Sequence, residues 1–246
     1  MLLHVGTHKT GTTSLQTFLR EQNSDLLSQV DAFYPPGFLL PVVHTELPLL
    51  TIRPERTWPA RLRFPETRRP SWLAAAADHV RGEVVDPAHR CLIYVHEDLS
   101  YLRFEDELER LKVLFASRAV TVVVFLRERA AFLRSYRSQL EGTGFEPSTD
   151  PASFAYVEPD SWLLDYDALI NAYRRCFGTR NVRVFDYDEV VRRDGTVIPA
   201  FMDILGVPRS SLPPLDTYFY NRSGAHIRLP DEQLAAIRRH LAQRYP

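Results

Sequence analysis

The stretch Leu2-Leu3-His4-Val5-Gly6-Thr7-His8-Lys9-Thr10-Gly11-Thr12-Thr13-Ser14-Leu15-Gln16-Thr17-Phe18-Leu19 decides the fold of this chain. Its apolar start predicts a strand over residues 2–5, its two glycines indicate a loop, and the spacing of the last apolar residues predicts a helix. The first N–H groups of such a helix lack internal acceptors and carry the positive end of the helix dipole. A strand, loop and helix in this order therefore favour the binding of a phosphate or sulfate group.

The side chains of this loop favour an anion as well. Lys9 supplies a full positive charge. Hydroxyl donors are present at Thr10, Thr12, Thr13 and Ser14. Gly6 and Gly11 have the separation found in the nucleotide-triphosphate signature GxxxxGK[ST], but Lys9 precedes the second glycine, and no hydroxyl follows a lysine where Mg²⁺ would be held. The loop is therefore predicted to bind a different anion; a turn that only reverses the chain is the alternative.

The pattern GTHKTGTTSLQ resembles the 5′-phosphosulfate-binding loop of the sulfotransferase family, in the form of its bacterial members. These enzymes use 3′-phosphoadenosine 5′-phosphosulfate (PAPS) as sulfate donor and release 3′-phosphoadenosine 5′-phosphate (PAP). The resemblance implies that Lys9 is catalytic and contacts the oxygen between phosphate and sulfate. It implies cofactor binding by Gly6, His8, Lys9, Thr10, Gly11, Thr12, Thr13 and Ser14. It further implies a P-loop-like sulfotransferase fold and a reaction that needs no metal.

Length and composition bound the remaining possibilities. The 246 residues show no break in composition, which predicts one α/β domain over residues 1–246, with three α/β/α layers and a mostly parallel central sheet. The net charge of −1 gives no overall attraction to nucleic acid. Cys91 and Cys176 lack a metal-type spacing, which indicates a reduced, intracellular protein. A strand within two residues of Met1 and the short apolar run 119–126 predict a cytoplasmic protein without a membrane partner.

Apolar runs predict the remaining strands at residues 31–34, 91–95, 120–126 and 181–185. The run 120–126 is continuous and rich in β-branched residues, which favours the centre of the sheet. Helices are expected at residues 71–85, 105–115, 129–140, 162–177, 196–205 and from 231. Ser71 is the expected N-cap of the first of these.

Three ionisable residues, His96, Glu97 and Asp98, follow the strand at 91–95. In open α/β sheets this is the edge where ligands bind. Transfer of a group to a hydroxyl needs a base that accepts the hydroxyl proton. The segment VHEDL is similar to the strand-then-Glu pattern of sulfotransferases, which implies that Glu97 is the base, with His96 as the alternative. A helix-capping role for His96 or Asp98 is the competing interpretation.

Two further segments resemble cofactor-binding elements of the family. FLRERAAFLRSYRSQL is similar to the 3′-phosphate element and implies roles for Arg127 and Ser135; an arginine can bind a phosphate through two hydrogen bonds. The segment after residue 185 is similar to the family's Tyr-Glu-Asp-Leu element and places Tyr187 near the adenine; a buried core tyrosine is the alternative. The Arg-Lys-Gly loop of cytosolic members is absent, and Arg222-Ser223-Gly224 is a faint counterpart.

Residues 35–70 form a segment rich in proline and arginine, expected to be irregular. Long loops in compact domains are often functional. The segment contains six arginines and His44, which favours a substrate-recognition insert for an acidic acceptor with His44 as a substrate-binding residue. A solvated surface loop is the alternative. The loop 142–159 is a second candidate for the acceptor site.

These features predict a sulfotransferase that moves a sulfuryl group from PAPS to a hydroxyl or amine of a small-molecule or glycan acceptor. The arginine-rich insert favours a carbohydrate. A P-loop-type nucleotide kinase is an alternative that would need Mg²⁺ ligands and a lysine after the second glycine. A non-catalytic nucleotide-binding protein is the other, and it would be indifferent to the loss of Glu97.

Overall fold

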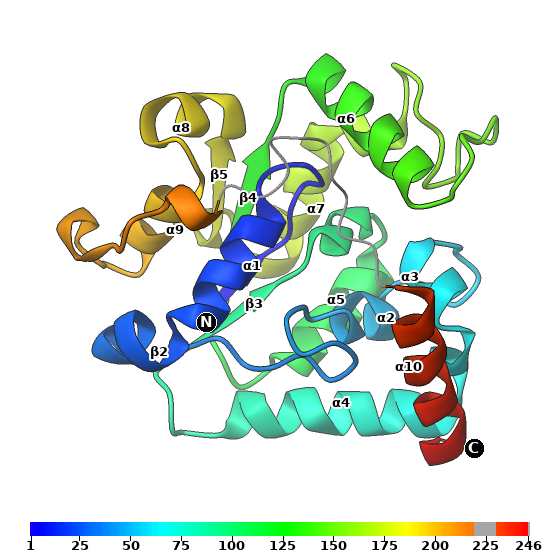
Figure 1. The fold of residues 1–246 in the computed structure, drawn as a ribbon, viewed down its shortest axis with the longest axis horizontal. Helices are drawn as coiled ribbons and strands as arrows, with labels where there is room; N and C mark the ends of the chain where they lie inside the picture. Colours follow the sequence, from blue (N-terminus) through cyan, green and yellow to red (C-terminus); the bar gives the residue numbers. More distant parts are fainter. Residues whose placement is uncertain (219–229, 246) are drawn as a thin grey trace.

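A computed structural model describes residues 1–218 and 230–245, and its centre is a five-stranded sheet (Figure 1). The strands are β1 (Leu2–His4), β2 (Ala32–Phe33), β3 (Cys91–Val95), β4 (Thr121–Leu126) and β5 (Val182–Asp186). Their order is β2-β3-β1-β4-β5, and all neighbouring pairs are parallel. This confirms the predicted parallel sheet. The expectation for the 120–126 strand is corrected in one respect: β1 is the middle strand, because two strands lie on each side of it, and β4 is its inner neighbour.

Helices cover both faces of the sheet. They are α1 (Thr12–Glu21), α2 (Glu46–Thr51), α3 (Pro59–Arg63), α4 (Pro70–Val85), α5 (Glu105–Leu114), α6 (Arg129–Gly142), α7 (Tyr166–Phe177), α8 (Tyr187–Asp194), α9 (Ile198–Ile204) and α10 (Asp231–Arg244). Apolar residues of α4, α5 and α7 pack on one face, and those of α1, α8 and α9 pack on the other. The three α/β/α layers predicted from the sequence are therefore present (Figure 1).

The inner strands are apolar throughout because they are buried on both faces. In β4, Val122 and Val124 belong to the core on the α5 side, whereas Val123 and Phe125 belong to the core on the α1 side. Successive side chains of a strand point to opposite faces, so a strand between two helical layers needs apolar residues at every position. This explains why its sequence lacks the alternation of a half-exposed strand.

Three details of the predicted elements are corrected by the structure. The segment 35–70 is not irregular throughout, since it forms α2, α3 and a 3₁₀ turn at Pro65–Arg68. Helix α4 begins at Pro70 with Arg69 as its N-cap, because a proline fits the first helical position. Residues 162–164 form a 3₁₀ turn, and α7 begins only at Tyr166, where the carboxylate of Asp165 accepts the N–H of Ala168.

The arginines of the insert hold it to the rest of the chain. Arg53 forms an ion pair with Asp106 at 2.7 Å, and Arg56 forms one with Glu107 at 2.8 Å, so both reach α5. Arg61 is almost fully buried. Its guanidinium donates to the carbonyl oxygens of Leu49, Ile52, Arg53, Pro54 and Arg56. Arg53, Arg56 and Arg61 are thus engaged within the chain, so they do not support the expected recognition of an acidic acceptor.

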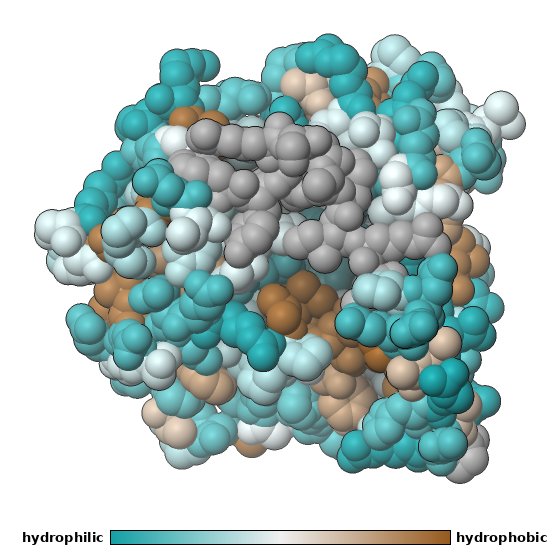
Figure 2. Space-filling view, viewed as in Figure 1, coloured by the Kyte–Doolittle hydropathy of each residue, from teal (hydrophilic) through white to brown (hydrophobic). Residues whose placement is uncertain are grey.

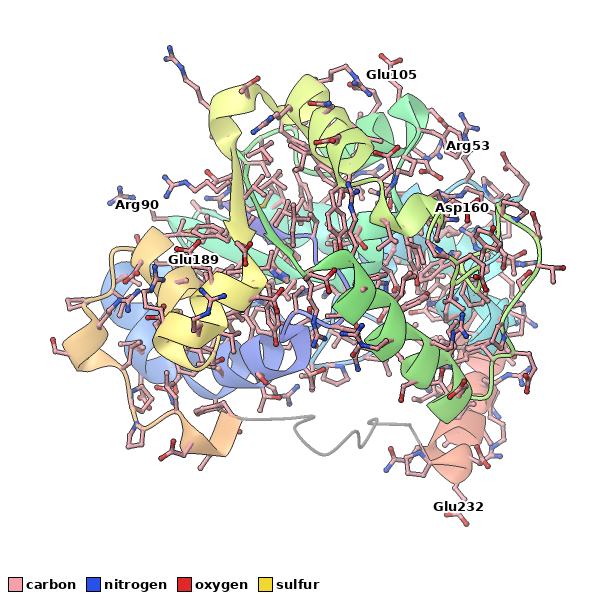
Figure 3. All side chains as sticks on the ribbon, turned by 90° about the horizontal axis from the view of Figure 1, so that it is seen from above. Arg53, Arg90, Glu105, Asp160, Glu189 and Glu232 are labelled. Atoms are coloured by element: carbon pink, nitrogen blue, oxygen red, sulfur yellow. The ribbon has the colours of Figure 1, made fainter. Side chains whose placement is uncertain are left out.

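The surface is mainly polar. Figure 2 shows hydrophilic residues over most of one face, with apolar residues gathered in its lower middle. Figure 3, a view turned by 90°, shows that charged side chains such as Arg53, Arg90 and Glu232 lie at the outside of the molecule. Within the described residues, no helix has both the length and the apolar character needed to cross a membrane.

His4 predicts an acid sensitivity of the fold. Its ring is fully buried between Phe125 and Phe201, and neither ring nitrogen has a partner within the described residues. Burial lowers the pKa of His4 from 6.5 to about 3. As the pH falls, the unfolded chain binds a proton at this histidine before the folded chain does. The contribution of His4 to stability is therefore fully present above pH 6.5 and is lost as the pH drops toward 3. Between pH 7 and pH 5 this residue should cost about 2 kcal/mol of unfolding free energy.

The measurement is urea unfolding of wild type and His4→Leu at both pH values. His4→Leu should remove about 2 kcal/mol of the acid loss, because leucine has no proton to bind in either state. His240→Leu, at an exposed position of α10, is the control and should keep the wild-type pH dependence. An unchanged pH dependence in His4→Leu would contradict the interpretation.

Candidate active site

The predicted functional groups follow four strands at one edge of the sheet. The loop Gly6–Gly11 follows β1, the 3₁₀ turn Glu97–Tyr101 follows β3, Arg127 follows β4, and Tyr187 opens α8 directly after β5. All of these strands are parallel, so their carboxyl ends lie together. This is the edge at which open α/β sheets bind ligands.

Glycines set the path of the loop after β1. Gly6 has a φ of 99°, and a Cβ atom there would lie 3.0 Å from the carbonyl oxygen of Glu97. The loop can therefore lie directly against the turn that bears Glu97. Gly11, with a φ of 75°, is the N-cap of α1, and among the described residues no side chain caps the helix. The N–H groups at the start of α1 thus remain available to an anion.

The hydroxyl groups of the loop have two different uses. Thr10 donates its hydroxyl to the carbonyl oxygen of Thr7 at 2.6 Å, and Thr7 donates to that of Phe125 at 3.3 Å. These two side chains shape the loop, so the hydroxyl of Thr10 is not a free donor for a cofactor. Thr12 differs, because its hydroxyl is buried without a partner within the described residues. Thr13 and Ser14 lie beside it in the first turn of α1.

Two cations lie side by side at this loop. Arg127 donates from Nη1 to the carbonyl oxygen of Lys9 at 3.2 Å. Burial and the charge of Arg127 lower the pKa of Lys9, while the charge of Glu97 opposes them. Neither Lys9 nor Arg127 forms an ion pair within residues 1–218 and 230–245, and Nε of Arg127 is buried without an acceptor. Adjacent, uncompensated cations at a helix N-terminus are the pattern of an anion site.

Tyr187 joins this group. The guanidinium carbon of Arg127 lies 5.4 Å from the centre of the Tyr187 ring. The same ring lies 3.9 Å from the position that a Cβ atom of Gly11 would take. The structure thus brings Gly11, Arg127 and Tyr187 together, although they are far apart in the chain. Ser135 lies half-buried on α6, two turns beyond its start.

Glu97 opens the 3₁₀ turn after β3 and lies against the loop at Gly6. Its side chain is half-buried, and Oε2 is enclosed without a hydrogen-bond partner within the described residues. Its charge raises the pKa of Lys9, so the two groups lie near one another. A carboxylate without an internal partner keeps its lone pairs available for a proton.

His96, the alternative to Glu97 as the base, has another task. In His96, Nδ1 accepts the N–H of Asp98 at 3.1 Å, and Nε2 lies 3.2 Å from the hydroxyl of Thr45. His96 thus has a capping role, as in the competing interpretation, but it caps the 3₁₀ turn Glu97–Tyr101 and not an α-helix. Neither nitrogen is free to serve as the base.

His44 does not lie at the site. Its ring is fully buried, with Nδ1 accepting the N–H of Val95 at 3.1 Å and Nε2 lying 2.9 Å from the carbonyl oxygen of Pro35. Burial lowers the pKa of His44 to about 4. His44 therefore ties the insert to β3 and offers no nitrogen to a substrate, which corrects the expected substrate contact.

One residue of the loop, His8, forms a buried pair that the sequence did not indicate. Nε2 of His8 is 3.2 Å from Oδ1 of Asp98, an ion-pair contact without aligned hydrogen-bond geometry. Burial alone would raise the pKa of Asp98, but His8 and His96 bring it below its ordinary value. The ring of His8 stacks on Tyr101 at 4.8 Å. His8 is thus fixed by its surroundings, and no local pattern marks Asp98 as its partner.

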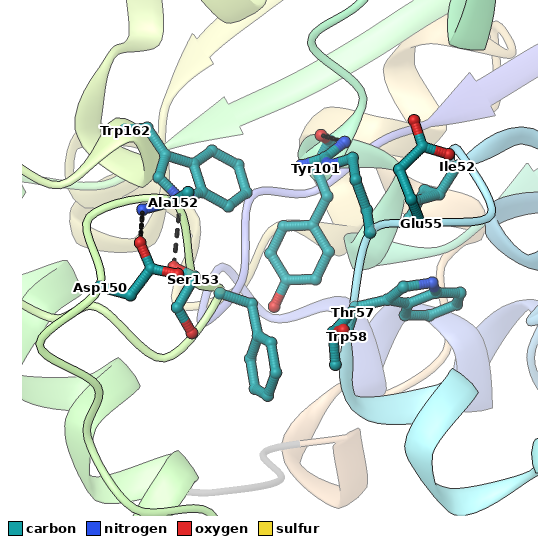
Figure 4. Close-up of a pocket in the computed structure, with 11 residues that line it drawn as sticks. Ile52, Glu55, Thr57, Trp58, Tyr101, Asp150, Ala152, Ser153 and Trp162 are labelled. Atoms are coloured by element: carbon teal, nitrogen blue, oxygen red, sulfur yellow. Dashed lines mark hydrogen bonds between the residues drawn. The ribbon is translucent and has the colours of Figure 1, made fainter.

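Tyr101 forms part of the lining of a cavity of about 300 Å³ (Figure 4). Its walls come from the insert at residues 52–58, from the loop at residues 150–154, and from Trp162. Two segments that the sequence marked as candidates for the acceptor site therefore meet at one cavity. Arg222-Ser223-Gly224, the faint counterpart of the closing loop, lies outside the described residues.

Comparison with known structures bears on the fold. A crystal structure of a sulfotransferase from Alicyclobacillus acidocaldarius matches with a TM-score of 0.59, over 99% of this chain and 93% of that chain, at 18% sequence identity. At this identity the likeness shows the fold: the chain is an α/β protein with the architecture of that sulfotransferase. No model of a known protein family matches the chain, and neither does any curated protein.

Proposed function

We propose that this protein is a sulfotransferase that moves a sulfuryl group from PAPS to a hydroxyl or amine of an acceptor. The observation that carries the proposal is the pair of Lys9 and Arg127 at the N-terminus of α1. Neither side chain forms an ion pair within the described residues, and burial lowers the pKa of Lys9 although the nearby charge of Glu97 opposes this. Bound phosphate and sulfate groups would supply the missing negative charge.

The residues present fit this donor. The polar groups without partners here are mainly donors: the N–H groups of α1, the hydroxyl of Thr12 and Nε of Arg127. Lys9 and the first turn of α1 would hold the 5′-phosphosulfate. Arg127 and Ser135 would hold the 3′-phosphate, and Tyr187 would lie on the adenine side. A polyanionic ligand would satisfy donors that would otherwise stay buried and unpaired, at a cost of about 1–3 kcal/mol each.

The chain's own residues divide the work of transfer. PAPS, when bound, supplies a sulfuryl group whose S–O bond to the phosphate breaks as the acceptor oxygen bonds to sulfur. Lys9 stabilises the electron pair that remains on the phosphate oxygen. Glu97 takes the proton from the acceptor hydroxyl and later returns it to water. Both side chains are half-buried, where the dielectric is lower than in water. Their electrostatic interactions with the reacting groups are therefore stronger than they would be in water.

The proposal is tested by incubation with sulfur-35-labelled PAPS and a panel of sugars, phenols and amines. We expect label in an acceptor, and calorimetry should detect binding of PAP. No heat of PAP binding, or Mg²⁺-dependent phosphate transfer from ATP, would overturn the proposal. PAP binding without transfer to any acceptor would support a non-catalytic nucleotide-binding protein instead.

Arg127→Ala is expected to weaken PAP binding about 10- to 100-fold, because each charge-assisted hydrogen bond contributes about 1.5–3 kcal/mol. Calorimetric titration with PAP measures the change. The matched control is Arg129→Ala, two residues on, where the side chain is exposed at the start of α6. If both variants bind PAP like wild type, Arg127 does not hold the 3′-phosphate.

A further inference from the structure

Four aromatic residues contribute to the walls of the cavity that Tyr101 lines. Tyr101 and Trp162 stand at 64° to each other with centres 5.6 Å apart, and Phe154 and Trp58 complete the apolar walls (Figure 4). Aromatic rings in a cavity bind ligands through their flat apolar faces.

The walls of the cavity are held in place. The indole N–H of Trp162 donates to the carbonyl oxygen of Ser153 at 3.1 Å (Figure 4). The hydroxyl of Tyr101 lies 2.5 Å from that of Tyr136, which donates to the carbonyl oxygen of Phe154 at 3.1 Å. These bonds link the loop 150–162 to Tyr101 and α6. The cavity is therefore preformed, which lowers the entropy cost of binding a ligand.

The charges at the cavity favour a ligand without negative charge. Arg56 is the cation of the lining, and it is already neutralised by Glu107 at 2.8 Å. Two carboxylates remain, Glu55 and Asp150, which are exposed and form no ion pair within the described residues. The lining therefore carries an excess of negative charge, the opposite of what an arginine-rich insert suggests.

The cavity adjoins the proposed transfer site through Tyr101. One face of this ring stacks on His8 of the anion loop, and Tyr101 is the last residue of the turn that begins with Glu97. Tyr101 itself lines the cavity. An occupant would thus lie one side chain away from the loop.

We propose that this cavity binds the non-reacting part of the acceptor, and that this part is an uncharged ring bearing hydroxyl groups, such as a sugar. The inference rests on the proposed function. The aromatic walls pack against the C–H face of such a ring, while Glu55 and Asp150 accept hydrogen bonds from its hydroxyl groups. A volume of about 300 Å³ is at the lower end for ligand cavities, so it holds a group of about ring size.

The test compares ligands that differ by one charge. 4-Nitrophenyl β-D-glucoside and 4-nitrophenyl β-D-glucuronide are titrated calorimetrically, with and without PAP. The glucoside should bind about fivefold to tenfold more tightly, because two carboxylates repel the glucuronate at an effective dielectric near that of water. In the double variant Glu55→Gln/Asp150→Asn, the glucuronide should bind more tightly than it does to wild type. The two ligands should then bind about equally tightly.

Trp162→Phe and Trp162→Ala should weaken glucoside binding progressively and leave PAP binding as in wild type, which also checks that the variants are folded. Equal or tighter binding of the glucuronide by wild type overturns the inference. So does equally tight binding of 4-nitrophenol, which would make the occupant a flat aromatic ring. Absence of PAP binding overturns the proposed function and leaves the glycoside preference as a separate result.

Discussion

Lys9→Ala is expected to lower sulfuryl-transfer turnover about 10²- to 10³-fold, the effect of removing one preorganised charge-stabilising group. The charge that Lys9 meets is greatest when the S–O bond to the phosphate breaks, so kcat should fall more than the affinity for PAPS. Lys9→Arg should restore little of the rate, because a planar guanidinium cannot take the place of a compact ammonium. Steady-state kinetics with labelled PAPS measure both variants.

The same substitution should leave the fold intact. Burial and the neighbouring Arg127 lower the pKa of Lys9, so the charged form is held at some cost in the folded protein. Removing the charge should therefore keep or raise the urea midpoint. Lys112→Ala is the matched control, because Lys112 is the only other lysine and lies exposed on α5, 3.6 Å from Glu109. Wild-type turnover in Lys9→Ala would remove the basis of the proposed function.

Much of the fold could be predicted because its information is local. Two runs, residues 91–95 and 122–126, have apolar side chains on both faces of the strand. Strands that lie between two helical layers require this pattern. In a parallel sheet the residues after each strand meet at one edge. Lys9, Glu97 and Arg127 could therefore be placed together from their position after three predicted strands, without knowledge of any contact.

What could not be predicted depends on pairing between distant segments. Arg56 lies 51 residues from its partner Glu107, and nothing near either residue indicates the contact. His44 similarly looks available in the sequence, but β3 and the main chain of Pro35 use both of its nitrogens. The cavity is a third case, since its aromatic walls come from residues that meet only after the insert and the loop 150–154 have packed around Tyr101.

Glu97→Gln is expected to lower turnover about 10²- to 10⁴-fold with the cofactor affinity kept. The amide retains the shape of the carboxylate but does not accept a proton at neutral pH. His96 cannot take over, because its two nitrogens face the N–H of Asp98 and the hydroxyl of Thr45. Calorimetric titration with PAP separates a loss of chemistry from a loss of folding. Glu141→Gln, at an exposed position at the end of α6, is the control.

The size of this loss should depend on the acceptor. A base contributes most when the acceptor hydroxyl holds its proton tightly, as in a sugar, and least when the proton leaves readily, as in 4-nitrophenol. Turnover of Glu97→Gln should therefore approach that of wild type as the acceptor hydroxyl becomes more acidic, whereas Lys9→Ala should be slow with every acceptor, because Lys9 acts on the leaving phosphate. An equal loss across acceptors would mean that Glu97 positions the substrate and that another group takes the proton. His8, the loop residue that pairs with Asp98, would then be the next residue to replace.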